Sequence, residues 1–73
     1  MSELRSIDAR GLSCPQPVLL TRNAINKIKE GTIEVIVDSG ASRDNVSRLA
    51  RNSGWVVTVE EKPGGVYWVV LKK

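Results

Sequence analysis

Cys14 is the only cysteine in the chain, and it opens the run Cys14–Pro17, which spells Cys-Pro-Gln-Pro. Proline is favoured in a first helical turn, where no intrahelical N–H is lost, so the spacing puts Cys14 at the start of a predicted helix. Unpaired N–H groups and the helix dipole favour a thiolate there. Arg10 or Arg22 would add positive charge if either turned toward the sulfur. We therefore expect an at least partly exposed thiol with modest activation.

The residue types that are missing narrow the chemistry of this thiol. The chain has no histidine, so it cannot build a Ser-His or Cys-His catalytic pair, and one cysteine without histidine gives no zinc site. A single cysteine also excludes an internal CxxC redox cycle. Thiol exchange and sulfur transfer need only a thiolate, because a sulfur atom is attacked and a sulfur atom leaves. The structural alternative is an inert core cysteine, which the position of Cys14 after a glycine-containing loop argues against.

The elements that must position Cys14 follow the order β-α-β-α-β-β. Periodicity and turn residues predict strands at Leu4–Ala9, Thr32–Asp38, Trp55–Glu61 and Val66–Lys72, a helix from Pro15 to a stop at Gly31, and a helix from a Ser42 cap to Gly54. Right-handed crossovers put both helices on one face of the sheet, which predicts an α+β fold, a two-layer α/β sandwich. The predicted shared core comprises Val18, Ala24, Ile25, Ile28, Val35, Val37, Val46 and Leu49.

Composition and charge limit the classes of protein that remain. The 73 residues form one predicted domain, 1–73, and with 41% hydrophobic and 26% charged residues it should fold. The start has no signal-like pattern and no run is long enough to cross a bilayer, so we expect neither export nor a membrane partner. A small chain without a disulfide suits the cytoplasm. The net charge of +3 is spread along the chain, so nucleic-acid binding is permitted but not indicated.

The run Asp8–Val18 closely resembles the signature of the TusA/SirA-like sulfur carriers, a sulfurtransferase family whose Cys-Pro-x-Pro motif opens the first helix. The second half, especially Ser42–Val46 and Trp55–Glu61, looks most like the amino-terminal domain of the selenium-metabolism protein YedF. The resemblance implies a four-stranded mixed sheet and a cysteine that receives persulfide sulfur from a donor and passes it on. It implies Cys14 as the carrier, with Pro15 and Pro17 as its rigid frame and Arg10, Arg22 and Asp38 as supporting residues. Gln16 stands where some members have an acidic residue.

The main hypothesis is thus a sulfur carrier or sulfurtransferase component that serves tRNA thiolation, cofactor sulfuration or selenium metabolism. Its expected partners are a cysteine desulfurase or other persulfide donor and a downstream acceptor protein, and we expect no bound cofactor or metal. The alternative is a small nucleic-acid-binding or regulatory module, although direct nucleic-acid binding is not our expectation. A third hypothesis is a protein-interaction domain, which would use the uncovered sheet face if Ile36, Val56 and Val69 are exposed together there.

Overall fold

The computed structural model describes residues 3–12, 16–28 and 30–73 of the chain. Its elements follow the predicted order, and their bounds are β1 (Glu3–Asp8), α1 (Gln16–Lys27), β2 (Gly31–Val37), α2 (Gly40–Asn52), β3 (Val56–Lys62) and β4 (Val66–Lys72). All four predicted strands and both predicted helices are therefore present, with ends that differ by a few residues.

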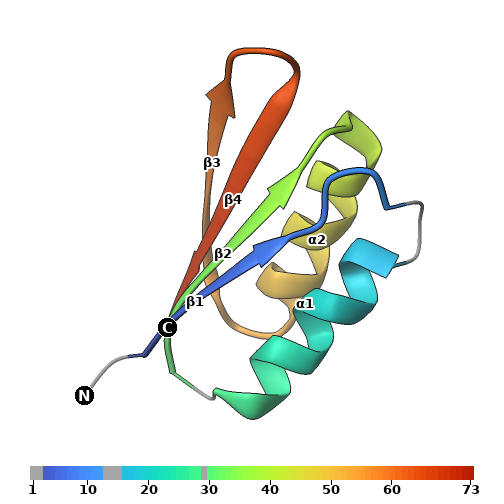
Figure 1. Cartoon of the computed structure of the whole chain (residues 1–73). Coiled ribbons are helices and arrows are strands. Elements are labelled where there is room, and N and C mark those ends of the chain that lie inside the picture. The colour runs from blue at the N-terminus through green and yellow to red at the C-terminus, as the bar shows by residue number, and fades with distance from the viewer. Residues whose placement is uncertain (1–2, 13–15, 29) are drawn as a thin grey trace.

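The four strands form one mixed sheet in the order β1-β2-β4-β3. β1 and β2 are parallel, whereas β4 runs antiparallel to both of its neighbours, β2 and β3. Both helices lie on the same side of this sheet (Figure 1), with α1 against β1 and β2 and α2 against β3 and β4. The predicted α+β architecture, a two-layer sandwich with two helices on one face, is confirmed.

The core lies between the helices and the two central strands. Along β2 the buried residues alternate as Ile33, Val35 and Val37, which is the period of two expected when one face of a strand is covered. Leu71 and Val69 of β4 lie opposite the first two of these in the register and are fully buried with them. The predicted core is largely right: Ala24, Ile25, Ile28, Val35, Val37 and Val46 are buried, whereas Val18 and Leu49 are half-buried.

The condition for the third hypothesis, apolar residues exposed together on the uncovered sheet face, is not met by Val69. Val69 pairs with Val35, so both side chains point toward the helices, and its exposed fraction is 0%. The half-buried Ile36 and the exposed Val56 do lie on the face without helices, but β4 lies between their strands, and they pair with Trp68 and Lys72, four residues apart on that strand. Apolar residues thus occur on the uncovered face, but not as the predicted trio.

The boundaries of the two helices need two corrections. Ser39, not Ser42, caps α2: its extended backbone (φ −145°, ψ 150°) precedes the helix, and its hydroxyl accepts a hydrogen bond from the Ser42 amide at 3.1 Å. The described part of α1 ends at Lys27, before the predicted stop at Gly31. Gly31 instead belongs to β2, because its amide and carbonyl both pair with the backbone of Lys73.

Candidate functional site

The loop that follows β1 begins with an ion pair between Asp8 and Arg10. The Arg10 guanidinium donates from Nε to Asp8 Oδ1 at 2.9 Å and from Nη2 to Asp8 Oδ2 at 2.8 Å, and the Arg10 amide also donates to Oδ1. This bidentate contact lowers the pKa of Asp8 to about 2 from its ordinary 3.8 and raises the pKa of Arg10. The Arg10 guanidinium is therefore held by Asp8 within this loop.

The next residue of the loop, Gly11, is tied to the end of β2. Its amide donates a hydrogen bond of 2.9 Å to Asp38 Oδ2, so the predicted supporting residue Asp38 does reach the loop. Gly11 has φ of +77°, a conformation that favours glycine whatever the surrounding space. On either side, Ala9 donates to the Ile36 carbonyl at 2.8 Å and Leu12 to the Ala9 carbonyl at 3.4 Å. The loop is therefore anchored to β2 by backbone and side chain.

The start of α1 is anchored as well. Pro17 is buried in the first described turn of the helix, and its carbonyl accepts a hydrogen bond of 2.8 Å from the hydroxyl of the fully buried Thr21. Val18 packs against the core from the next position. Pro17 is thus packed into the protein interior at the start of α1.

Two of the predicted site residues, Cys14 and Pro15, lie outside the described residues. Their flanks, Leu12 and Gln16, are described: Leu12 packs partly buried against the core, and Gln16 is exposed at the start of α1. The anchors above thus belong to the two segments that precede and follow Cys14 in the chain.

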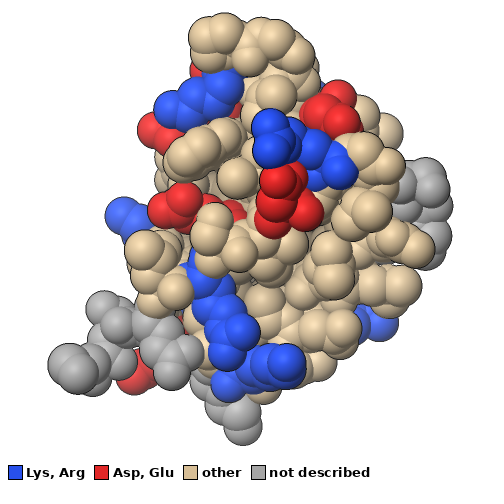
Figure 2. All heavy atoms as spheres, viewed as in Figure 1, with Lys and Arg blue, Asp and Glu red and all other residues tan. Residues whose placement is uncertain are grey.

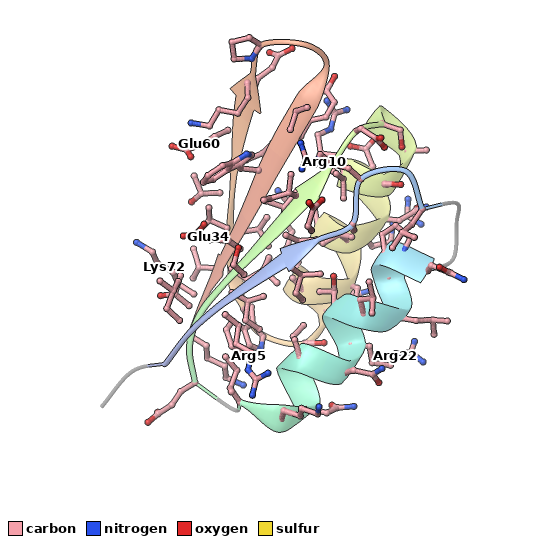
Figure 3. All side chains as sticks on the ribbon, viewed as in Figure 1. Arg5, Arg10, Arg22, Glu34, Glu60 and Lys72 are labelled. Atoms are coloured by element: carbon pink, nitrogen blue, oxygen red, sulfur yellow. The ribbon has the colours of Figure 1, made fainter. Side chains whose placement is uncertain are left out.

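The structure separates the two predicted cationic residues. Arg22 is exposed on α1, and Figure 3 shows it well apart from Arg10, which lies on the loop beside β2. None of the ion pairs within residues 3–12, 16–28 and 30–73 involves Arg22. Its guanidinium is therefore available to solvent or to a partner, whereas that of Arg10 is occupied.

Asp8 and Gly11 are the structural contributors that the residue-by-residue reasoning missed. Both stand in the run that carries the family resemblance, but no pattern rule assigned either of them a role. An aspartate at a strand end is a signal for a hydrogen bond from the backbone amide two residues on, which here is the amide of Arg10. A glycine between that arginine and the cysteine is a signal for a turn with positive φ.

The acidic side chains, the helices and the surface charge bear on the other kinds of site that the sequence left open. In the described part of the chain, no group of three acidic side chains gathers where a metal ion would be held. No described helix is long and apolar enough to cross a bilayer. On the upper part of the face shown in Figure 2, acidic and basic side chains lie side by side, whereas in the lower part basic side chains neighbour one another. One broad basic surface across the whole face, which is the electrostatic footprint of nucleic-acid binding, is not seen in this view.

Comparison with known proteins gives one consistent result. A family model described as Sulfurtransferase TusA matches residues 5–73. The chain is 34% identical over 71 residues to a protein of Methanocaldococcus jannaschii named provisionally as a sulfur carrier, covering 96% of this chain and 95% of the other. It is 27% identical over 70 residues to the sulfur carrier protein TusA of Allochromatium vinosum, covering 94% and 92%. The crystal structure of a SirA-like protein from Desulfitobacterium hafniense matches with a TM-score of 0.88, 33% identity and 96% coverage of both chains.

Proposed function

The chain belongs to the TusA sulfurtransferase family, as its motif predicted, and from that premise we propose that it is a sulfur carrier that holds sulfur as a persulfide on Cys14. The carrier takes this sulfur from a donor protein and delivers it to an acceptor protein. The observation that supports the proposal most strongly is the family match over residues 5–73, which includes the only cysteine.

The charging step is a thiolate attack on a donor persulfide. The Cys14 thiolate attacks the terminal sulfur of the donor's Cys–S–SH group, a new S–S bond forms to Cys14, and the donor's S–S bond breaks. The donor leaves as its own thiolate and the proton stays with the transferred sulfur, so no external oxidant or reductant is consumed. Delivery repeats the same exchange, with an acceptor thiolate as the nucleophile. Each step needs a reachable sulfur and no histidine.

The anchored flanks of Cys14 support this proposal physically. The Gly11–Asp38 hydrogen bond fixes the loop before the cysteine, and buried Pro17 fixes the helix after it. Residues that hold a reactive group from a rigid scaffold reduce the conformational cost of each encounter. A carrier must enter the sites of two different proteins, and fixed segments before and after the cysteine in the chain suit repeated docking and release.

We assign different supporting roles to the two arginines. Arg10 fixes the loop through its bidentate contact with Asp8, whereas Arg22 is free of ion pairs among the described residues and presents charge to a partner. We propose a cysteine desulfurase or another persulfide donor as the charging partner. A chain that works through a free thiol fits the reducing cytoplasm, and tRNA thiolation, cofactor sulfuration and selenium metabolism are the pathways that its acceptor could serve.

Mass spectrometry tests the proposal directly. The purified protein is incubated with a cysteine desulfurase and cysteine, and the expected product carries one extra sulfur atom on the peptide that contains Cys14. A thiol reductant should remove this sulfur, since it is held in an S–S bond. Cys14→Ser is the negative control, and Asp44→Ala, an exposed carboxylate on α2, is a control that should load normally. A wild-type protein that gains no sulfur, or a Cys14→Ser variant that gains the same extra sulfur atom, would contradict the persulfide on Cys14.

A further inference from the structure

A groove runs between α2 and the edge strand β3, on the side of the molecule away from β1. Its volume is 380 Å³, and it is lined by Asp44, Ser47, Arg48, Arg51, Asn52 and Val59. Val59 pairs with Val69 in the sheet, so its side chain lies on the face that the helices cover. Val69 is nevertheless 0% exposed and Val59 40% exposed, because Val59 lies on the edge strand, which in the described part of the chain has a neighbouring strand on one side alone. Val59 is thus the apolar residue of the groove lining, and the five other lining residues, all from α2, are polar or charged.

The backbone next to this groove is an open sheet edge. In the order β1-β2-β4-β3 the last strand is at the border, and its pairing within the described residues is with β4 alone. The outward N–H and C=O groups of Val56–Lys62 are a template on which another extended strand can be added. Every second side chain of such a strand would lie on the helix-covered face, beside Val59 and facing the groove-lining residues of α2.

The wall of the groove carries unbalanced positive charge. Arg48 and Arg51 are exposed on α2, and neither takes part in the ion pairs found in residues 3–12, 16–28 and 30–73. The acidic residue of the lining, Asp44, is held by Arg43, whose Nε donates to Asp44 Oδ1 at 3.0 Å. An incoming strand that brings a carboxylate to Arg48 or Arg51 would complement this charge, whereas a basic strand would be repelled.

We propose that the occupant of this edge and groove is β3 of a second copy of the chain, added antiparallel so that two four-stranded sheets become one. β3 itself has the required pattern, because its side chains on the helix-covered face are Val57, Val59 and Glu61. With Val59 opposite Val59, the second copy's Glu61 lies opposite Val57, two residues along the strand. The two-fold arrangement makes each contact twice.

The position of Arg51 fits this register. α2 ends at Asn52 and β3 begins at Val56, so Val57 lies beside the last turn of α2, where Arg51 stands. The Glu61 of the same molecule lies toward the opposite end of the groove, where its negative charge contributes to the raised pKa of Arg43. Glu61 from the second copy therefore reaches the arginines that lack an acidic partner. This assembly is separate from the proposed sulfur transfer, because β1 and the loop after it are at the other border of the sheet.

Substitutions that reverse the charge of Arg51 or of Glu61 test the proposed pairing of the two β3 strands. Sedimentation velocity over a concentration series, with reductant present so that no Cys14 disulfide contributes, should show a reversible monomer–dimer equilibrium for the wild type. Arg51→Glu alone and Glu61→Arg alone each place like charges at both contacts, and each should raise the dimer dissociation constant about tenfold or more. An equimolar mixture of the two variants restores opposite charges at both contacts and should form a mixed dimer, seen by native mass spectrometry. Arg22→Glu, with the same charge change on α1, should dimerise like the wild type.

Three results would overturn the pairing. The first is a wild type that remains monomeric up to about 1 mM, which corresponds to negligible self-affinity. The second is a dimer that is unchanged by both single variants, since it would use another surface. The third is a mixture of the two variants that forms no mixed dimer. Circular dichroism of each variant shows whether it keeps the wild-type fold, and loading of Cys14 by a donor remains a separate measurement of the proposed function.

Discussion

The Asp38 carboxylate accepts a hydrogen bond of 2.9 Å from the Gly11 amide, joining residues that are 27 positions apart in the sequence. Gly11 follows β1 and Asp38 follows β2 directly. Because β1 and β2 are parallel neighbours, their carboxyl ends meet at the same end of the sheet. The hydrogen bond is thus a direct product of the crossover through α1, and it fixes the loop that leads to Cys14.

Removal of the Asp38 carboxylate should loosen this loop without unfolding the protein. A hydrogen bond of this kind contributes about 1 kcal/mol, so Asp38→Ala should increase hydrogen exchange of the Gly11 amide about fivefold. Charging of Cys14 by a persulfide donor should slow as well, because the loop spends less time in the docked geometry. Amide exchange followed by NMR and transfer rates by quenched mass spectrometry are the two measurements.

The matched variants for this prediction are Asp38→Asn and Asp44→Ala. Asn keeps an acceptor oxygen at the same place, so Asp38→Asn should restore much of the protection of Gly11. Asp44 is an exposed aspartate on α2, and its loss should leave the amide of Gly11 unaffected. Equal exchange at Gly11 in the wild type and in Asp38→Ala would show that the hydrogen bond does not hold the loop in solution.

Asp8 should titrate far below an ordinary aspartate. The Arg10 guanidinium holds the pKa of Asp8 at about 2, against 3.8 for the free side chain. The pKa is lower in the folded state, so the stabilising effect is complete above about pH 4 and is lost as the pH falls through about 2. The carboxyl carbon shift of Asp8 in NMR reports this midpoint directly.

Arg10→Gln should return the midpoint of Asp8 toward 3.8, because it removes the charged donor. Added salt should move the wild-type midpoint in the same direction, since both side chains are exposed and the pair is open to screening. Asp8→Asn should abolish this part of the pH dependence of unfolding. A wild-type midpoint near 3.8 would show that the ion pair is not maintained in solution.

Arg22 should govern the encounter with a partner rather than the reactivity of the thiol. Arg22→Glu should slow persulfide transfer from an acidic donor surface about three- to tenfold at low ionic strength, and salt should slow the wild type. Alkylation of Cys14 by a small neutral reagent should stay nearly unchanged. Lys72→Glu, which makes the same charge change at an exposed position of β4, is the matched control. Transfer rates that respond neither to Arg22→Glu nor to salt would leave Arg22 as an ordinary surface residue.

Leu71 should contribute strongly to folding stability. It is fully buried opposite Ile33, so Leu71→Ala should lower the free energy of unfolding by about 2 to 5 kcal/mol in urea denaturation. Leu4→Ala is the matched control at a position that is 68% exposed, and it should change the unfolding free energy by about 0.5 kcal/mol or less. Similar losses in the two variants would mean that the core does not centre on β4.

The sequence was sufficient for the element order because its periodicities are local. Ile33, Val35 and Val37 alternate within a few residues, and burial of one face follows from that alternation. The side of the sheet on which Val69 lies stayed open at the level of sequence, because it depends on how β4 pairs with β2, a contact between residues 34 positions apart. The cap of α2 was misplaced because Ser39 and Ser42 have the same side chain, and only the backbone conformation distinguishes them.

The supporting residues also differ in how far the sequence could place them. Pro17 and Asp38 were named from the motif, and the structure shows one buried and the other bonded to the loop. The bidentate pairing of Arg10 with Asp8 was not predicted, because a short ion pair depends on side-chain conformation as much as on spacing. The role of Arg22 stays a prediction, since its effect depends on a partner surface.

The central place of β4 in the sheet has a consequence for how the protein is made. β4 follows the other three strands in the sequence, yet it supplies β2 with its second neighbour and β3 with its partner. The contacts of β1, α1 and β2 join segments that are near in the sequence, so they can form early. Ile33 and Val35 gain their partners Leu71 and Val69 only after β4 has been synthesised. A chain cut before Val66 would therefore leave the β4-facing edge of β2, with Ile33 and Val35, without its neighbour and open to aggregation.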